Sequence, residues 1–264
     1  MPVDDVSQSC AALEHLVRQA GHLAIGQFRR LAGDSVHLKG HLDLVTAADR
    51  EVERFLTDGL SRLFPQDGVF GEEGAAVAGR SGRIWVIDPI DGTLNFVRGS
   101  EQWAVSVGLF EDGRPQFGII HAPARDQMLI GGRDLTPTLN GRALDPPSAL
   151  ERSSAVVAVS LNPAFPVPER LAVMEFIMAD AGMAFRNYGS AAISLLELAA
   201  GQVDGYVGLG LSTWDAMGGL AIIRALGMKD TIDWARLELT SKLKFVGGPR
   251  VFLDVFAPVI DRLR

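Results

Sequence analysis

The sequence is poor in cysteine, since Cys10 is the only one among 264 residues. A single cysteine excludes an internal disulfide and a cysteine-based metal site, and it favours a reducing compartment. No apolar run reaches the roughly 18 residues that a membrane-spanning helix needs. The start of the chain, MPVDDVSQSC, is acidic and polar and does not resemble a signal peptide. We therefore expect a soluble cytoplasmic protein.

Clusters of basic residues are also missing. The chain has 25 Lys and Arg residues against 32 Asp and Glu residues, which gives a formal net charge of −7. Such a chain repels a nucleic-acid backbone overall, so we expect neither nucleic acid nor a membrane as a partner. The acidic excess could supply the carboxylates of a metal enzyme, although solubility is the commoner reason for it.

The signatures of several enzyme classes are absent as well. The chain has no P-loop, no HExxH and no GxSxG, and its five histidines are scattered without the spacing of metal ligands. A Ser-x-x-Lys match at 241–244 is short enough to arise by chance. The glycines at 205, 208 and 210 lack the order of a dinucleotide fingerprint and indicate a tight turn instead.

The pattern of apolar residues predicts an α/β protein in two halves, 1–150 and 151–264, with no flexible linker between them. In the second half strands and helices alternate, which favours a sheet covered by helices. Asn140-Gly141 marks a turn, and residues 111–114 join a hairpin. The expected helices span about 6–31, 47–64, 168–180, 190–200 and 214–226, with one more at the end, and the expected strands 84–87, 103–110, 115–121, 155–159, 183–187, 203–207 and 244–247.

The most informative segment runs from Trp85 to Phe96. An apolar strand delivers Asp88 to its carboxyl end, and Pro89 is expected to end the strand there because it cannot donate to a sheet. Asp91 follows three residues later, and two carboxylates so close repel each other unless a cation such as Mg²⁺ lies between them. A helix or tight turn starting at Thr93 would present free N–H groups to an anion. The whole segment therefore predicts a metal and phosphate site.

Two further acidic segments are weak signals when taken alone. Gly71-Glu72-Glu73-Gly74 follows an apolar run, but such a segment is more often a solvated turn. Asp215 follows Trp214, and an aspartate at the start of a helix is usually a cap.

In this order and at these separations, Glu72-Glu73, Asp88 to Thr93 and Trp214-Asp215-Ala216 resemble the inositol monophosphatase family. The resemblance extends from the first helix to about residue 228. It implies the family's five-layered α-β-α-β-α sandwich, shared with fructose-1,6-bisphosphatase. It also implies a lithium-sensitive hydrolase of phosphate monoesters with two or three Mg²⁺ ions, a small phosphorylated metabolite as substrate, and a homodimer.

The resemblance assigns roles to individual residues. In the family's mechanism, Thr93 and Asp49 hold the attacking water, and no covalent intermediate forms. Thr46 and Asp49 also fit a capping box, and both interpretations of Asp49 can hold. Lys39 and Glu73 match the region of an outer metal, although a solvated lysine is almost as good an interpretation. The implied metal ligands are Glu72, Asp88, Asp91, Asp215 and the Ile90 carbonyl, and the implied substrate contacts are Asp91, Gly92, Thr93, Gly189, Ser190 and Ala191.

Two departures from the family leave the substrate open. Gly208 stands where inositol-specific members have a glutamate that binds a ring hydroxyl, and Arg224-Ala225-Leu226-Gly227 replaces the usual Glu-Ala-Gly-Gly. The alternatives with the same chemistry are histidinol phosphate, fructose 1,6-bisphosphate and 3′-phosphoadenosine 5′-phosphate. A further alternative is a regulator that binds a partner and catalyses nothing.

Overall fold

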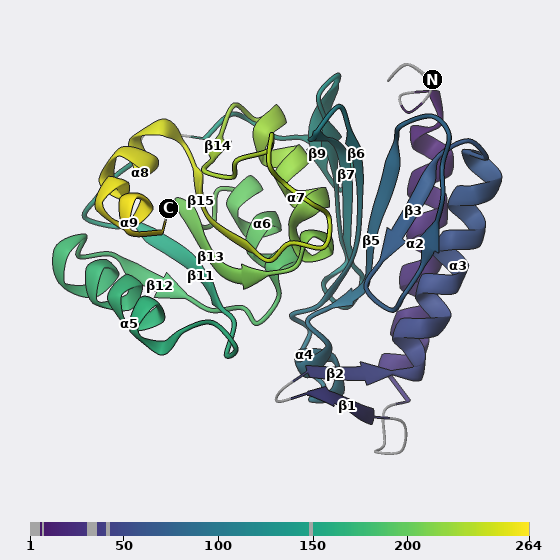
Figure 1. Ribbon diagram of the computed structural model, residues 1–264, viewed down its shortest axis with the longest axis horizontal. Helices are drawn as coiled ribbons and strands as arrows, with labels where there is room; N and C mark the ends of the chain where they lie inside the picture. Colours follow the sequence, from purple (N-terminus) through teal and green to yellow (C-terminus); the bar gives the residue numbers. More distant parts are fainter. Residues whose placement is uncertain (1–5, 7, 31–35, 41–42, 148–149, 264) are drawn as a thin grey trace.

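The computed structural model describes residues 6, 8–30, 36–40, 43–147 and 150–263, with the backbone alone at 36–40, 43–46 and 261–263. Five layers follow one another across the molecule, helices alternating with sheets (Figure 1). This is the layered α/β sandwich that the resemblance implies. Within the described residues no helix is both long and apolar enough to span a membrane.

The first two layers come from the first part of the chain. Helices α2 (Cys10–Phe28) and α3 (Ala47–Leu63) pack on each other and cover one face of an eight-stranded sheet. The sheet has the order β10-β9-β8-β7-β6-β5-β3-β4 and is antiparallel except between β3 and β5. Its strands are β3 (Gly68–Gly71), β4 (Ala76–Val77), β5 (Ile84–Asp91), β6 (Ala104–Glu111), β7 (Arg114–Ala122), β8 (Gln127–Gly132), β9 (Leu135–Leu139) and β10 (Arg142–Ala143).

The central layer is a pair of helices, α6 (Ala191–Ala199) and α7 (Thr213–Ala225), which lie between the two sheets (Figure 1). Every residue of α6 is buried, as expected for a helix covered on both sides. Helix α7 lies directly on β6 and β7, because a Cβ atom at Gly108 or Gly118 would collide with the backbone of Gly218. This close approach brings the start of α7 to the end of β5.

The last two layers are a five-stranded sheet and its outer helices. The sheet has the order β12-β11-β13-β15-β14. The elements are β11 (Val156–Leu161), α5 (Val167–Glu175), the π-helical η2 (Phe176–Asp180), β12 (Ala184–Arg186), β13 (Gly205–Leu211), β14 (Lys229–Asp230), β15 (Leu243–Gly248), α8 (Arg250–Val255) and α9 (Ala257–Leu263).

Short elements complete the chain. Strands β1 (Val36–Gly40) and β2 (Asp43–Thr46) form an antiparallel pair that lies near α4 (Thr93–Val97) (Figure 1). The 3-10 turn η1 (Pro123–Arg125) joins β7 to β8.

Most of the predicted elements are confirmed, including the helix that starts at Thr93, the hairpin at 111–114 and the turn at Asn140-Gly141. The prediction that β5 stops at Asp88 is wrong, because the strand continues through Pro89 to Asp91. The predicted helix 168–180 divides into α5 and the π-helical η2. The division into halves at residue 150 stays a prediction.

Candidate active site

Asp88 and Asp91 lie on β5, where its pairing with β6 is irregular. Asp88 lies opposite Ser106 and Asp91 opposite Ala104, so the register shifts between them. In a regular strand residues three apart point to opposite faces, and the shift instead lets both carboxylates reach one point. Oδ1 of Asp88 accepts a hydrogen bond of 3.1 Å from the Ile90 N–H, which fixes the local turn of the backbone.

The side chain of Asp91 extends from β5 to the start of α6. Its Oδ2 accepts hydrogen bonds from the Ser190 hydroxyl and from the Ala192 N–H, each 2.5 Å long. Ser190 also caps α6, because its oxygen accepts the Ile193 N–H at 3.0 Å. Free N–H groups at a helix start stabilise a negative charge. Helix α6 belongs to the second half of the chain, so that half supplies the hydrogen-bond donors for the Asp91 carboxylate.

Asp215 lies in the first turn of α7, where it forms a capping box with Ser212. Its Oδ2 accepts the Ser212 N–H at 2.8 Å. Ser212 is thus the N-cap, and Asp215 contributes to the cap from the third helical position rather than as the N-cap itself. Lys242 donates to the Ser212 hydroxyl at 2.6 Å and, as a nearby positive charge, favours the ionised form of Asp215.

Asp88, Asp91 and Asp215 each offer an oxygen atom to one point, and these atoms lie within 4.8 Å of one another. Burial raises the pKa of all three carboxyls, to about 6 for Asp91 and about 7 for Asp215. Glu72 and the other two aspartates further raise the pKa of Asp88 by repulsion. An all-oxygen set of crowded, buried carboxylates fits a hard divalent cation such as Mg²⁺.

Thr93 and Asp49 meet beside this cluster. The Thr93 hydroxyl lies 3.1 Å from the Ile90 carbonyl oxygen and 3.4 Å from Oδ1 of Asp49. Asp49 is buried in the first turn of α3, and its charge contributes to the raised pKa of Asp88. The structure thus brings Asp49 to Thr93. The capping alternative needs the Thr46 side chain, which lies outside the described residues.

Gly92 connects β5 to α4 in the left-handed conformation, with φ of 96°. A Cβ atom there would lie 2.8 Å from the Gln102 carbonyl oxygen and 3.1 Å from Cβ of Ser190. Only glycine combines this φ with so close an approach, which keeps the backbone of Gly92 and Thr93 beside the carboxylates.

Glu72 lies in the turn after β3, beside the three aspartates but outside their tight cluster. Its charge reaches Asp88, as the raised pKa of Asp88 indicates. The turn itself is held by buried Glu53 of α3, which accepts the N–H groups of Glu73 and Ala75 at 2.6 and 2.9 Å. Glu53 could not be recognised from the sequence, because a glutamate inside a polar helix carries no local signal.

Changing Glu53 to Gln should weaken Mg²⁺ binding without unfolding the protein. Glutamine can offer only one oxygen to the two N–H groups, so the turn that carries Glu72 loosens. Losing such an outer-shell partner typically costs about 10–100-fold in metal affinity. Thermal shift against Mg²⁺ concentration measures this, and the control is Glu14→Gln, which changes a glutamate of α2 that pairs with Arg18. Equal Mg²⁺ dependence in both variants would contradict the assigned role.

Asn95 is a second residue whose role the sequence does not indicate. Its Nδ2 donates to the carbonyl oxygens of Gln102 at 2.6 Å and Tyr188 at 2.7 Å. Gly189 packs against this amide, since a Cβ atom there would lie 2.9 Å from Nδ2. Asn95 therefore ties α4 to the segment 189–191, which was predicted to contact substrate.

The remaining predicted residues are placed as follows. Ser190 and Ala191 start α6 against Asp91, and Gly189 precedes them with φ of 67°. Glu73 follows Glu72, and its N–H binds Glu53. Lys39 belongs to β1, but its side chain lies outside the described residues.

Gly208, the position at which the resemblance implies a glutamate in inositol-specific members, is buried in the middle of β13. A Cβ atom there would lie 2.7 Å from Leu211 and 3.1 Å from Phe245. A larger side chain at this position would press on apolar neighbours, so this chain offers no hydroxyl-binding carboxylate from that strand.

Comparison with known proteins agrees with this fold and carboxylate set. The profile of the inositol monophosphatase family matches residues 5–240, and the chain belongs to that family. It is 33% identical to "Inositol-1-monophosphatase" of Bacillus subtilis over 190 residues, covering 70% of this chain and 71% of the relative. It is 32% identical to "Fructose-1,6-bisphosphatase/inositol-1-monophosphatase" of Thermotoga maritima, covering 80% of each.

Other relatives carry a different kind of name. "Nus factor SuhB" of Pasteurella multocida is 30% identical over 246 residues, which is 90% of each chain. Among solved structures, extragenic suppressor protein suhB of Bartonella henselae superposes with a TM-score of 0.84 at 25% identity, covering 93% of this chain and 95% of that one. The family is therefore established, while the names of its members describe different functions.

Proposed function

We propose that this protein is a Mg²⁺-dependent phosphatase of a small phosphate monoester. The observation that carries the proposal is the buried cluster of Asp88, Asp91 and Asp215, whose oxygen atoms converge within 4.8 Å. Family membership supports the same reading. A cluster of mutually repelling carboxylates costs folding stability unless a cation fills it, which is a reason for a catalytic use.

The proposed metal ligands are the three aspartates, Glu72 and the Ile90 carbonyl oxygen. When bound, Mg²⁺ supplies positive charge that polarises the phosphoryl group and lowers the pKa of bound water. Asp215 is held by the Ser212 N–H and Asp91 by the start of α6, so two ligands are oriented before the metal binds.

The residues of the chain would then position phosphate and water. The backbone N–H groups of Gly92 and Thr93 bind phosphate oxygens. With its proton directed to Ile90 or Asp49, the Thr93 oxygen accepts a hydrogen bond from the attacking water and aims it at phosphorus. Attack forms one P–O bond and breaks the ester P–O bond, which releases the alcohol and inorganic phosphate.

The substrate is proposed as a sugar or polyol phosphate. Gly208 removes the carboxylate that would favour inositol, so histidinol phosphate, fructose 1,6-bisphosphate and 3′-phosphoadenosine 5′-phosphate remain candidates. One relative is named for both fructose bisphosphate and inositol phosphate, which supports a broad pocket.

Phosphate release from a panel of these esters and inositol 1-phosphate, with and without Mg²⁺, tests the proposal. We expect Mg²⁺-dependent release from at least one ester and inhibition by Li⁺. A folded protein that releases no phosphate from any of them would overturn it.

A non-catalytic role is the second candidate, because several relatives bear the name "Nus factor SuhB". In that case a variant with Asp88→Asn would keep its function in cells although it hydrolyses nothing. Loss of hydrolysis together with loss of the function in cells would favour the phosphatase.

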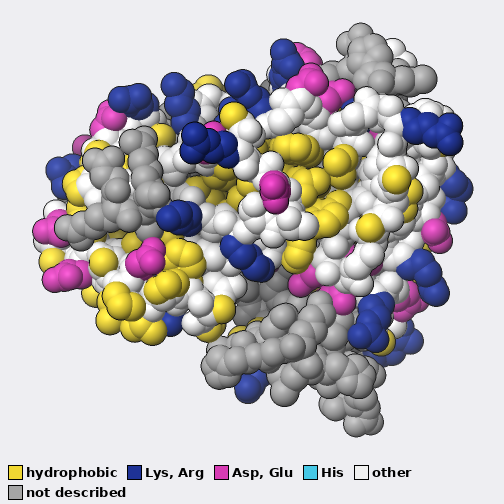
Figure 2. Space-filling model, in the orientation of Figure 1, with side chains coloured by type: hydrophobic (Ala, Val, Ile, Leu, Met, Phe, Trp, Pro, Cys, Tyr) yellow, Lys and Arg dark blue, Asp and Glu magenta, His cyan; other side chains and the backbone are white. Residues whose placement is uncertain are grey.

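We also propose that the protein is a homodimer. Large apolar side chains gather over α5 and η2 and on the edge strand β12, where Figure 2 shows a yellow patch at the lower left. Its members are Val167, Leu171, Met178 and Phe185, with Leu171 63% and Met178 57% exposed. A patch of this kind commonly marks an interface, and two identical chains most often pair symmetrically.

Changing Leu171 to Glu is expected to shift the protein from dimer to monomer, because the charge would be buried against the partner. Light scattering after gel filtration measures the molar mass. Val251→Glu on α8 places the same charge at another exposed apolar site and should leave the mass unchanged. An unchanged mass for Leu171→Glu, or a monomeric wild type, would contradict this interface.

A further inference from the structure

A cavity of about 390 Å³ lies at the opposite end of α7 from the carboxylate cluster. Arg224 is nine residues after Asp215 on this helix, a separation of roughly 14 Å along the axis. On β7 the cavity begins at Arg114, which lies opposite Glu111 at the far end of β6. The end of β6 near the carboxylate cluster is Ala104, which lies opposite Asp91. The cavity is therefore separate from the candidate active site.

Three arginines line this cavity, although the chain carries a net charge of −7. Arg224 pairs with Asp230 at 2.6 Å, and its guanidinium lies 5.7 Å from the Trp234 ring. Within the part of the chain that the structure describes, the side chains of Arg114 and Arg133 form no ion pair or hydrogen bond. Among the described residues, only one of the three guanidinium groups is therefore engaged in an ion pair.

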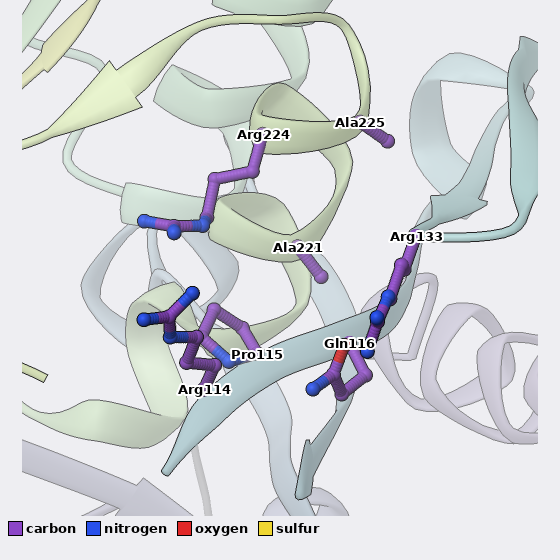
Figure 3. A pocket seen from close by; sticks show the side chains of 7 residues that line it. All are labelled: Arg114, Pro115, Gln116, Arg133, Ala221, Arg224 and Ala225. Carbon is purple, nitrogen blue, oxygen red and sulfur yellow. The ribbon is translucent and has the colours of Figure 1, made fainter. Parts of the chain in front are cut away.

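The arrangement of these side chains suits a molecule with two separate anionic groups. Figure 3 shows the guanidinium groups of Arg114 and Arg224 on the same side of the cavity, and Arg133 with Gln116 on the other. The remaining lining is apolar, formed by Pro115 of β7 and by Ala221 and Ala225 of α7. Like charges that face one cavity repel each other, and a bound anion relieves that repulsion.

We propose that this cavity binds a small organic phosphate with at least two anionic groups, such as a nucleoside diphosphate. The planar fork of arginine binds phosphate oxygens in pairs, and the apolar lining accepts the organic part. The volume lies in the range of small-molecule sites. Arg224, in the last turn of α7, also offsets the negative end of the helix that an anion would otherwise meet.

Calorimetric titration of metal-free protein with ADP in EDTA tests this site. Without metal the carboxylate cluster repels phosphate, so binding there does not interfere, and the test does not depend on the proposed phosphatase activity. We expect one ADP per chain, with a dissociation constant that rises with salt concentration.

The variant Arg114→Gln/Arg133→Gln removes two exposed charges and should weaken ADP binding at least about tenfold, the effect of losing roughly 1.4 kcal/mol. The matched control, Arg62→Gln/Arg250→Gln, removes two exposed charges from α3 and α8 and should bind ADP like the wild type. No binding to wild type, or equal binding to both double variants, would overturn the proposal.

Discussion

Changing Asp88 to Asn is expected to stabilise the metal-free protein while abolishing Mg²⁺-dependent phosphate release. Asparagine keeps an oxygen for the Ile90 N–H but removes a negative charge that Glu72 and the two other aspartates repel. Each pKa unit of such repulsion corresponds to about 1.4 kcal/mol, so we expect a gain on the order of 1 kcal/mol at pH 8. Activity should fall more than about 100-fold, beyond the loss for an outer-shell partner.

The stability gain should depend on pH in a defined direction. The pKa values of Asp91 and Asp215 are raised to about 6 and 7, so the folded state binds more protons than the unfolded one above pH 4. The wild type therefore loses stability as pH rises through 6 and 7. Below that window its cluster is protonated, and the advantage of Asp88→Asn shrinks.

Thermal unfolding in EDTA at pH 5 and pH 8 measures this difference. Buried His121 is common to both proteins, so its lowered pKa cancels in the comparison. Asp58→Asn, which removes an exposed charge from α3, is the control and should change little. A variant Asp88→Asn less stable than the wild type at pH 8 would show that the three carboxylates do not repel each other.

Changing Asp67 to Ala is expected to cause a large loss of stability. Asp67 and Arg83 form an ion pair in which both side chains are 2% exposed. Asp67 also accepts hydrogen bonds from the Ser81 hydroxyl at 2.7 Å and the Trp85 indole N–H at 2.9 Å. Removing one partner of a buried pair typically costs about 3–5 kcal/mol, because the other charge stays buried.

For a chain of this size that cost corresponds to roughly 10 °C in melting temperature. Denaturant and thermal unfolding both measure it. The control is Asp233→Ala, which breaks an exposed pair with Arg236 and should change stability by less than about 0.5 kcal/mol. Equal losses of unfolding free energy in both variants would contradict the expectation that burial makes the Asp67–Arg83 pair costly to break. Asp67 lies away from the carboxylate cluster, so metal binding by folded protein should be unchanged.

The part of the candidate site that lies in one short segment could be predicted from the sequence. Asp88, Asp91 and Thr93 belong to one short segment, and an apolar strand before it places them at a sheet edge. The ligand role of Asp215 follows only from the resemblance to the family, because its position at a helix start predicts no more than a cap. The alternation of strands and helices predicts a sheet covered by helices, and the resemblance to the family supplies the five layers.

Long-range contacts could not be predicted in this way. Pro89 was expected to end β5, but the register shift against β6 lets the strand continue without the missing N–H. Glu53 accepts a backbone N–H 20 residues away and Asn95 donates to a backbone carbonyl 93 residues away, and no local spacing predicts such a partner. The arginine cavity likewise joins residues from β7, the end of β8 and α7.

The most direct test of the central claim is the binding of Mn²⁺, a spectroscopically visible substitute for Mg²⁺, followed by electron paramagnetic resonance. We expect saturable binding to the wild type that Mg²⁺ displaces, and much weaker binding to Asp88→Asn in a protein that remains folded. Equal Mn²⁺ binding by both proteins, or none by the wild type, would contradict a metal centre at Asp88, Asp91 and Asp215.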